Sequence, residues 1–246
     1  MDNENNISVL IKKVDRDYLE KNFGILLKKL YPMRKEAVER FNNKEAAYIS
    51  MTAGFVLMEA YDRTYGGKSS DIIIKKGENG KPFVEGHEDF KFNISHSGDY
   101  VVIAFTVSED INSLGIDIEK IRNRDDDMRV ANRFFSKSEI DYISDGLECS
   151  DIDMRFYKVW TMKEAYIKMT GKGLSQRLDS FSVNPDEFSV AFEEKTIDAS
   201  ESDSIKEDHK DYVKGTVCFD SKVFDGYTLT VCMSCSDKKI LNYEEI

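Results

Sequence analysis

The sequence is poor in positive charge and in long apolar runs, and each shortage excludes a class of protein. Lys and Arg number 35 against 46 Asp and Glu, and the net charge of −11 argues against a nucleic acid or an anionic membrane as the main partner. No stretch approaches the roughly 18 apolar residues of a membrane-spanning helix. Met1–Asn6 is polar and acidic, unlike a secretion leader. We therefore expect a cytoplasmic protein.

Cysteine and histidine are also scarce. The four cysteines are scattered over 246 residues, which makes a poor disulfide framework, and Cys232 and Cys235 form a lone C-x-x-C. A zinc site would need further ligands, and there are only three histidines to supply them. Because the C-x-x-C lies in the apolar run 227–235, buried strand cysteines are the favoured interpretation.

An acidic strand is predicted over Leu114–Glu119, where apolar and acidic residues alternate. A strand sends Ile116 and Ile118 to one face and Asp117 and Glu119 to the other. At about 4 Å and an effective dielectric constant of ~20, the two carboxylates repel by roughly 4 kcal/mol. A cation or a shared proton is therefore needed beside them, and a metal ion is one answer.

A helix is predicted around Trp160–Lys168, because apolar residues recur there at steps of three and four. This stripe consists of Phe156, Val159, Met162, Tyr166 and Met169. Tyr157, Thr161, Glu164 and Lys168 share the opposite face. Taken alone, that face is best interpreted as solvated, with a Glu-to-Lys pair that contributes only about 0.3 to 0.5 kcal/mol.

The first half of the chain mixes helices with antiparallel strands. The patterns predict a strand over Ile7–Val14, a helix from about Leu19 to Leu30, a helical stretch through Phe41 to Tyr61 that ends at Gly66–Gly67, and hairpins over Asp71–Val84 and Phe90–Val107. Asn112–Ser113 is the expected boundary, so the first half covers residues 1–112.

The second half, residues 113–246, begins with the acidic strand. Ser136–Glu139 has the spacing of a capping box, and the long helix from about Asp153 ends at Gly171. Further strands are predicted over Phe181–Val183, Phe188–Phe192, Tyr212–Phe219 and Tyr227–Cys235. The acidic segment 193–211 is expected to be a mobile loop. Both halves thus combine helices with a small sheet, which is an α+β pattern.

Two turns carry candidate anion-binding residues. Ser95 and His96 lie at the end of a strand, where an imidazole and backbone N–H groups can hold phosphate oxygens. A polar hairpin turn is the plain alternative. A Ser-His hydrolase dyad is disfavoured, because adjacent strand residues point to opposite faces and no G-x-S-x-G motif is present. Lys81, in Gly80-Lys81-Pro82, can meet an anion but taken alone is best interpreted as a surface lysine.

Together these blocks resemble one family, the surfactin-type 4′-phosphopantetheinyl transferases. The blocks that occur in the family's order and spacing are Phe92–Gly98, Gly115–Glu119, Arg133–Ser136, Trp160–Lys168 and Gly171–Ser175, and Leu178–Val183 extends the similarity. The resemblance covers the whole chain. It implies an α+β fold built as a pseudo-dimer of two similar α+β halves, a monomer with coenzyme A bound between the halves.

The resemblance also implies a reaction. The 4′-phosphopantetheine arm of coenzyme A is transferred to a serine hydroxyl of an apo acyl or peptidyl carrier protein, with Mg²⁺ as cofactor and 3′,5′-ADP as the released product. By the family's motifs, Asp117, Glu119 and Glu164 would hold Mg²⁺. Glu164 would also be the base, and Lys168 would lie near the leaving phosphate. Carrier-protein modification serves fatty acid, polyketide or nonribosomal peptide biosynthesis.

For coenzyme A, the resemblance places Ser95, His96 and Lys81 at the phosphates. Ser50 matches a small hydroxyl residue of the first half, and Arg34 matches one of the family's N-terminal basic residues. The chain departs from the family at two positions. Ala37 stands where many members carry another basic residue, and Ile49 stands where arginine is common. The substitutes available for the 3′-phosphate are Lys35, Arg40 and Lys44.

Two other functions use the same residues. One is a Mg²⁺-dependent pyrophosphate hydrolase that acts on coenzyme A-like substrates, but no motif marks an in-line water. The other is a noncatalytic module that binds coenzyme A or a carrier protein, but such a module has no use for Glu164 beside intact Asp117 and Glu119. The transferase is therefore the leading hypothesis.

The segment Lys120–Lys137 is the expected docking surface for the carrier protein. Carrier proteins of this kind are usually acidic, and a chain of net charge −11 repels them unless one surface is locally basic. The segment's basic residues are Lys120, Arg122, Arg124, Arg129, Arg133 and Lys137, with Ile121, Met128, Val130 and Phe134 among them. The alternative is a solvated helix whose apolar residues belong to the core.

Overall fold

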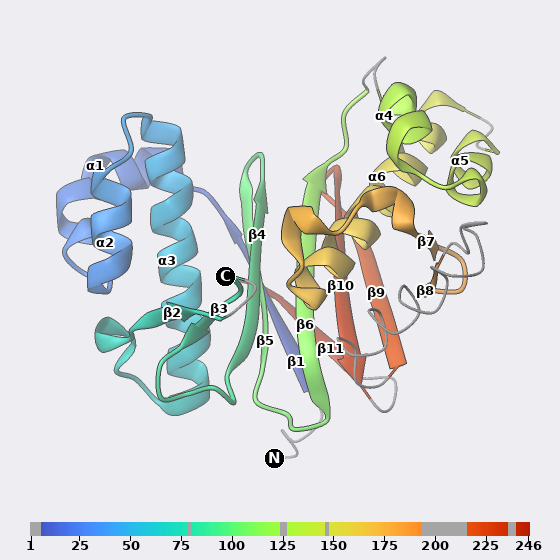
Figure 1. The fold of residues 1–246 in the computed structure, drawn as a ribbon. Helices are drawn as coiled ribbons and strands as arrows, with labels where there is room; N and C mark the ends of the chain where they lie inside the picture. The colour runs from blue at the N-terminus through green and yellow to red at the C-terminus, as the bar shows by residue number, and fades with distance from the viewer. Residues whose placement is uncertain (1–5, 78–79, 124–126, 146–147, 193–215, 236–239) are drawn as a thin grey trace. The chain divides into compact units, whose positions relative to one another are not determined.

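The fold comes from a computed structural model that describes residues 6–77, 80–123, 127–145, 148–192, 216–235 and 240–246 (Figure 1). The predicted loop 193–211 lies outside the described residues. The chain divides into two compact units, Met1–Glu109 with Ile240–Ile246, and Asp110–Lys239. In the described residues, no helix is both long and apolar enough to cross a membrane.

The first unit is a four-stranded sheet with three helices. The strands are β1 (Asn6–Lys13), β4 (Lys91–Ser97), β5 (Tyr100–Thr106) and β11 (Ile240–Glu245), in the order β11-β1-β5-β4. The helices are α1 (Arg16–Leu27), α2 (Pro32–Glu39) and α3 (Lys44–Tyr65). A 3-10 turn (η1, Ser69–Asp71) and the hairpin of β2 (Ile74–Lys76) and β3 (Pro82–Val84) complete the unit.

The core of the first unit lies between α3 and the sheet. Met51, Val56 and Leu57 of α3 form one buried cluster with Leu10, Val101 and Ile103 of the strands. The sequence predicts one helical stretch through Phe41, and this is wrong, because α2 ends at Glu39 and α3 begins at Lys44. The break has a local cause: the Asn43 side chain accepts hydrogen bonds from Glu45 N and Ala46 N and so starts a new helix.

The last strand joins the first unit. The sequence predicts that residues 113–246 form the second half, whereas β11 pairs in parallel with β1 of the first unit. The first boundary between the units lies between Glu109 and Asp110, close to the predicted Asn112–Ser113. This pairing covers an edge of β1 that would otherwise expose its backbone groups to water. The chain therefore returns to its first unit at its end.

The second unit is a three-stranded antiparallel sheet covered by a long helix. The strands β6 (Ile111–Lys120), β10 (Tyr227–Cys235) and β9 (Thr216–Phe224) lie in the order β6-β10-β9. The helices are α4 (Asp127–Phe134), α5 (Lys137–Ser144) and α6 (Cys149–Thr170), and α6 packs across β6 and β10. Two 3-10 turns, η2 (Gly173–Ser175) and η3 (Leu178–Ser180), lead to the hairpin of β7 (Phe181–Asn184) and β8 (Ser189–Phe192). The α+β class is thus confirmed.

Helix α6 rests directly on the backbone of β6. A Cβ atom on Gly115 would overlap the Ala165 carbonyl oxygen and lie 2.5 Å from Met169 N. Two residues before Gly115, and so on the same face of the strand, Ser113 Oγ donates a hydrogen bond to the Met169 carbonyl oxygen. Only glycine at position 115 permits this approach, because both atoms that it would meet belong to the helix backbone.

We predict that Gly115→Ala lowers the free energy of unfolding by at least about 2 kcal/mol, because the added methyl group pushes α6 away from the sheet. Gly24→Ala is the matched control, since a Cβ at Gly24 in α1 meets nothing within 4 Å. That control should be neutral or more stable by up to about 1 kcal/mol. Urea unfolding measures both variants, and equal stability of the two would contradict the direct contact.

Candidate active site

The two acids of β6 lie on the face of the sheet that α6 covers. The predicted alternation is confirmed, with Ile116 and Ile118 fully buried on the opposite face. Asp117 and Glu119 stand opposite Thr230 and Thr228 of β10. Cross-strand partners share a face, so two carboxylates and two hydroxyl groups lie together under the helix.

The polar side of α6 meets this face. Thr161 is fully buried, and its Oγ1 lies 2.8 Å from Oγ1 of Thr230, the residue opposite Asp117. Farther along α6, Lys168 Nζ donates to Asp117 Oδ1 at 2.7 Å. The interpretation of a solvated face is therefore wrong, and the cation that the acidic strand requires is supplied by Lys168.

Glu164 lies between Thr161 and Lys168 on this side of α6 and is partly buried. Burial raises the pKa of its carboxyl group above the usual glutamate value, the negative charges of Asp117 and Glu119 raise it further, and the Lys168 cation opposes them. The three acids named from the sequence therefore interact in the folded protein. A carboxylate of raised pKa accepts a proton more readily, which suits a general base.

The donor set fits a hard divalent cation. Three carboxylates are the ligands that Mg²⁺ prefers, and its remaining positions are usually taken by water and substrate phosphates. Among the described residues no ready group of three or more His, Cys, Asp or Glu side chains surrounds a metal position. Within the described residues, Thr228 Oγ1, opposite Glu119, is buried and has no hydrogen-bond partner. This face therefore contains a buried oxygen atom that can still accept or donate a hydrogen bond. Lys168 holds the positive charge at Asp117 in this structure.

A buried ion pair on another side of α6 fixes the rotation of the helix. Lys163 and Glu139 are both completely buried, and Lys163 Nζ lies 2.6 Å from Glu139 Oε1 and from the Phe181 carbonyl oxygen. Glu139 Oε2 also closes the predicted capping box by accepting from Ser136 N, which confirms that prediction. Glu164 follows Lys163 directly, so the pair sets the direction of the candidate base. No sequence pattern indicates this pair, because its two residues are 24 positions apart.

In the first unit, two residues predicted to bind coenzyme A lie in contact. Arg34 of α2 donates from Nη1 to Ser50 Oγ of α3 at 3.3 Å and from Nε to the Tyr31 hydroxyl at 3.1 Å. Gly54 makes room for this arginine, because a Cβ there would lie 2.6 Å from Arg34 Cγ. No sequence motif marks Tyr31 or Gly54, because their contacts are with the Arg34 side chain.

The three other predicted phosphate ligands lie on two hairpins of the first unit. Ser95 is buried and His96 is exposed in β4, so the two side chains lie on opposite faces, and a hydrolase dyad between them is excluded. His96 shares its face with Phe92 and Ile94, which pack against the core under α3. Lys81 immediately precedes β3 and is partly buried.

The comparisons with known proteins identify a family. The family model of the 4′-phosphopantetheinyl transferase superfamily matches residues 113–232, and the model of the 4′-phosphopantetheinyl transferase N-terminal region matches residues 18–108. These ranges include the candidate residues of both units.

Curated relatives match over most of their length. The 4′-phosphopantetheinyl transferase Sfp of Bacillus subtilis (strain 168) is 35% identical over 222 residues, which cover 87% of this chain and 88% of the relative. The transferase ffp of Bacillus subtilis is 32% identical over 226 residues, covering 91% of each chain. The transferase gsp of Aneurinibacillus migulanus is 27% identical over 226 residues, covering 92% of this chain and 85% of the relative.

Among solved structures, the holo-ACP-synthase from Plasmodium yoelii aligns with a TM-score of 0.37 and 12% identity, covering 52% of this chain and 97% of that chain. The assignment rests on the sequence relatives, whose similarity runs through both units. The chain therefore belongs to the 4′-phosphopantetheinyl transferase superfamily, in its Sfp-type family, and is a transferase of that kind.

Proposed function

We propose that the enzyme transfers the 4′-phosphopantetheine arm of coenzyme A to a serine hydroxyl of an apo acyl or peptidyl carrier protein. The reaction requires Mg²⁺ and releases 3′,5′-ADP. The observation that carries the proposal is the cluster of Asp117, Glu119, Glu164 and Lys168 between β6 and α6, because it combines carboxylates for a cation with a base and an ammonium group. We further propose that the enzyme acts as a monomer in the cytoplasm.

The three carboxylates have distinct parts in this proposal. Asp117, Glu119 and Glu164 would hold Mg²⁺, which when bound neutralises the pyrophosphate and polarises its phosphorus–oxygen bonds. With a cation held at Asp117, the Lys168 ammonium group would no longer be required to balance that carboxylate and could meet the leaving phosphate instead.

Glu164 acts on the acceptor. As the serine oxygen forms its bond to the β-phosphorus of coenzyme A, Glu164 takes the hydroxyl proton, directly or through water. The bond between that phosphorus and the bridging oxygen breaks, and 3′,5′-ADP leaves with the electron pair. Lys168 stabilises the charge that develops on the leaving phosphate.

The direct test is mass spectrometry of an apo carrier protein after incubation with the enzyme, coenzyme A and Mg²⁺. Modification should add one phosphopantetheine arm to one serine, and 3′,5′-ADP should appear in equal amount. Coenzyme A cleavage without modification of the carrier would point to the hydrolase instead. Binding of coenzyme A without either product would point to the noncatalytic module.

We predict that Asp117→Asn, Glu119→Gln and Glu164→Gln each lower kcat by about a hundredfold or more, because each removes a charge that would hold the cation. EDTA should have the same effect on the wild type. Mg²⁺ should raise the melting temperature of the wild type and raise it less in each variant, which tests metal binding separately from activity. Normal turnover of any of these variants in EDTA would contradict the metal site.

Stability against pH provides a control for Glu164. Its pKa is raised in the folded protein, so the folded state binds this proton more tightly than the unfolded chain. The free energy of unfolding therefore falls as pH rises from the ordinary glutamate pKa through the raised one. Metal-free Glu164→Gln should lose less stability over this range than the wild type. A variant that is inactive yet more stable at neutral pH cannot owe its inactivity to unfolding.

We predict a division between binding and turnover for the cationic residues. His96→Ala and Lys81→Ala should raise the KM for coenzyme A, because both lie on hairpins of the unit that also holds the Arg34–Ser50 contact. Lys168→Ala should mainly lower kcat, since its charge is required where the pyrophosphate splits. Calorimetry with coenzyme A separates the two effects, and unchanged affinity in both alanine variants would remove His96 and Lys81 from the site.

The carrier protein is proposed to dock at α4. Arg124 lies outside the described residues, and Ile121, Met128 and Val130 pack partly buried against the core of the second unit. Their structural interpretation is therefore supported. Phe134 differs, because 37% of it is exposed and the Arg133 guanidinium lies 5.1 Å from its ring centre. An exposed aromatic side chain with a cation suits an acidic partner that also offers an apolar contact.

We predict that Phe134→Asp and Arg133→Glu each raise the KM for the carrier protein severalfold and leave coenzyme A affinity unchanged. Met154→Asp on α6 is the matched control for a new charge at an exposed apolar side chain, because Met154 is 39% exposed, close to the value for Phe134. Steady-state modification at sub-saturating carrier protein measures the effect. If all three variants modify the carrier protein at equal rates, the carrier protein docks on another surface.

A further inference from the structure

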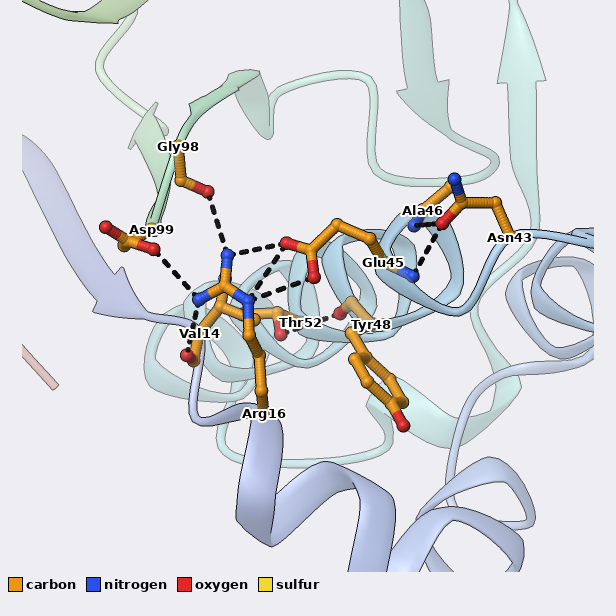
Figure 2. Close-up of polar contacts among 9 residues, drawn as sticks. All are labelled: Val14, Arg16, Asn43, Glu45, Ala46, Tyr48, Thr52, Gly98 and Asp99. Carbon is orange, nitrogen blue, oxygen red and sulfur yellow. Dashed lines mark hydrogen bonds and ion pairs between the residues drawn. The ribbon is translucent and has the colours of Figure 1, made fainter.

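Arg16, the first residue of α1, connects three segments of the first unit (Figure 2). Its Nε lies 2.9 Å from Glu45 Oε2, and its Nη2 lies 2.5 Å from Glu45 Oε1. On the other side of the guanidinium, Nη1 lies 2.9 Å from Asp99 Oδ1. Longer contacts of 3.4 Å reach the carbonyl oxygens of Val14 and Gly98. The guanidinium therefore joins two acids that are far apart in the sequence.

Each acid belongs to an element that carries predicted coenzyme A ligands. Glu45 lies in the first turn of α3, and Ser50 follows it by five residues on the same helix. Asp99 and Gly98 form the two-residue turn between β4 and β5, and Ser95 and His96 lie at the end of β4 just before this turn. Arg16 thus holds the start of α3 against the β4–β5 turn.

The fold does not depend on Arg16 alone at either contact. The Asn43 cap starts α3, and Val14 N donates to the Asp99 carbonyl oxygen at 2.8 Å. The charged side chains are also partly exposed, at 37% for Arg16, 44% for Glu45 and 37% for Asp99, so water weakens their effect on stability. Beyond these contacts, Arg16 fixes the position of the start of α3 relative to the β4–β5 turn. Its planar guanidinium can donate to the two carboxylates only when they occupy a narrow set of positions.

We propose that Arg16 is a positioning residue for coenzyme A, which aligns the His96 end of β4 with the Ser50 segment of α3. This inference rests on the proposed function. No sequence motif marks Arg16, because its partners Glu45 and Asp99 are brought to it only by the fold. A displacement of about 1 Å in a binding group is enough to weaken ligand binding severalfold or more.

A second arginine provides a matched control at the other end of α3. Arg63 Nε lies 2.8 Å from Glu59 Oε1 and Nη1 lies 2.5 Å from Glu244 Oε2, so it too joins two carboxylates, one on α3 and one on β11. Its exposure of 35% is close to that of Arg16. Arg63 is far along α3 from Ser50, by thirteen residues or about 20 Å. Loss of either arginine should cost similar stability.

The experiment compares Arg16→Ala, Arg16→Lys and Arg63→Ala by calorimetry with coenzyme A and by steady-state kinetics. We expect Arg16→Ala to weaken coenzyme A binding and raise its KM by about five- to tenfold, with kcat and the KM for the carrier protein changed less than twofold. Arg16→Lys should recover part of the affinity, because it keeps the charge but not the fork. Arg63→Ala should bind coenzyme A like the wild type.

Glu45→Gln distinguishes positioning from a direct contact between Arg16 and a phosphate. Removal of this negative charge should tighten coenzyme A binding if Arg16 itself meets the phosphate, and should weaken it about threefold or more if Arg16 only aligns α3 and the turn. Tighter binding, an unchanged affinity in Arg16→Ala, or an equal loss in Arg63→Ala would each overturn the proposal. Wild-type protein that binds coenzyme A but does not modify a carrier protein would overturn the proposed function and leave the positioning role standing.

Discussion

The second unit depends on the direct contact between α6 and the backbone of β6. Without a side chain at Gly115, the helix lies close enough for Ser113 to bond the Met169 carbonyl oxygen. This approach brings Glu164 and Lys168 over Asp117 and Glu119, where longer side chains between helix and strand would separate them. The buried Lys163–Glu139 pair then sets the rotation, so distance and direction have separate physical causes. Breaking one partner of such a pair leaves a buried charge, which is why rotation of the helix is strongly opposed.

Charge balance explains why the acids can stand together before any ligand arrives. Asp117 is buried, and its negative charge is compensated by Lys168 in the same unit. Burial raises the pKa of the Glu164 carboxyl group, and the negative charges of Asp117 and Glu119 raise it further against the opposing Lys168 cation. An ionised Glu164 therefore lowers the stability of the folded protein, whereas Asp117 is paired with the Lys168 cation. Stored electrostatic strain of this kind is common where a charged ligand binds.

The sequence predicted the parts of the site that depend on local pattern. Alternation placed Asp117 and Glu119 on one face, and the capping box at Ser136–Glu139 formed as expected. Contacts between distant segments were missed, because spacing along the chain carries no signal for them. From the sequence, Lys163 resembles any other charged residue on a helix, and its buried partner Glu139 cannot be identified. Likewise, no residue near Arg16 in the sequence indicates that it pairs with Asp99. The break before α3 was missed because apolar spacing continued through Phe41, while the Asn43 cap was the local signal that decided the structure. The pairing of β11 with β1 joins the two ends of the chain, so no local turn sequence indicates it.

The two units pack and orient their long helices in similar ways. Each packs one 22-residue helix, α3 or α6, against a sheet: the sheet of the first unit is antiparallel apart from the β1–β11 pair, and that of the second unit is wholly antiparallel. In each, a glycine admits a close neighbour: Gly54 makes room for Arg34, and Gly115 for α6 itself. In each, an ion pair between distant segments orients the helix, through Arg16 with Glu45 and through Lys163 with Glu139. The pairs differ in burial, and therefore in consequence. Removal of one partner of the buried pair would leave an uncompensated charge in the core, whereas the partly exposed Arg16–Glu45 pair contributes little to folding and acts mainly on the alignment of α3 with the β4–β5 turn.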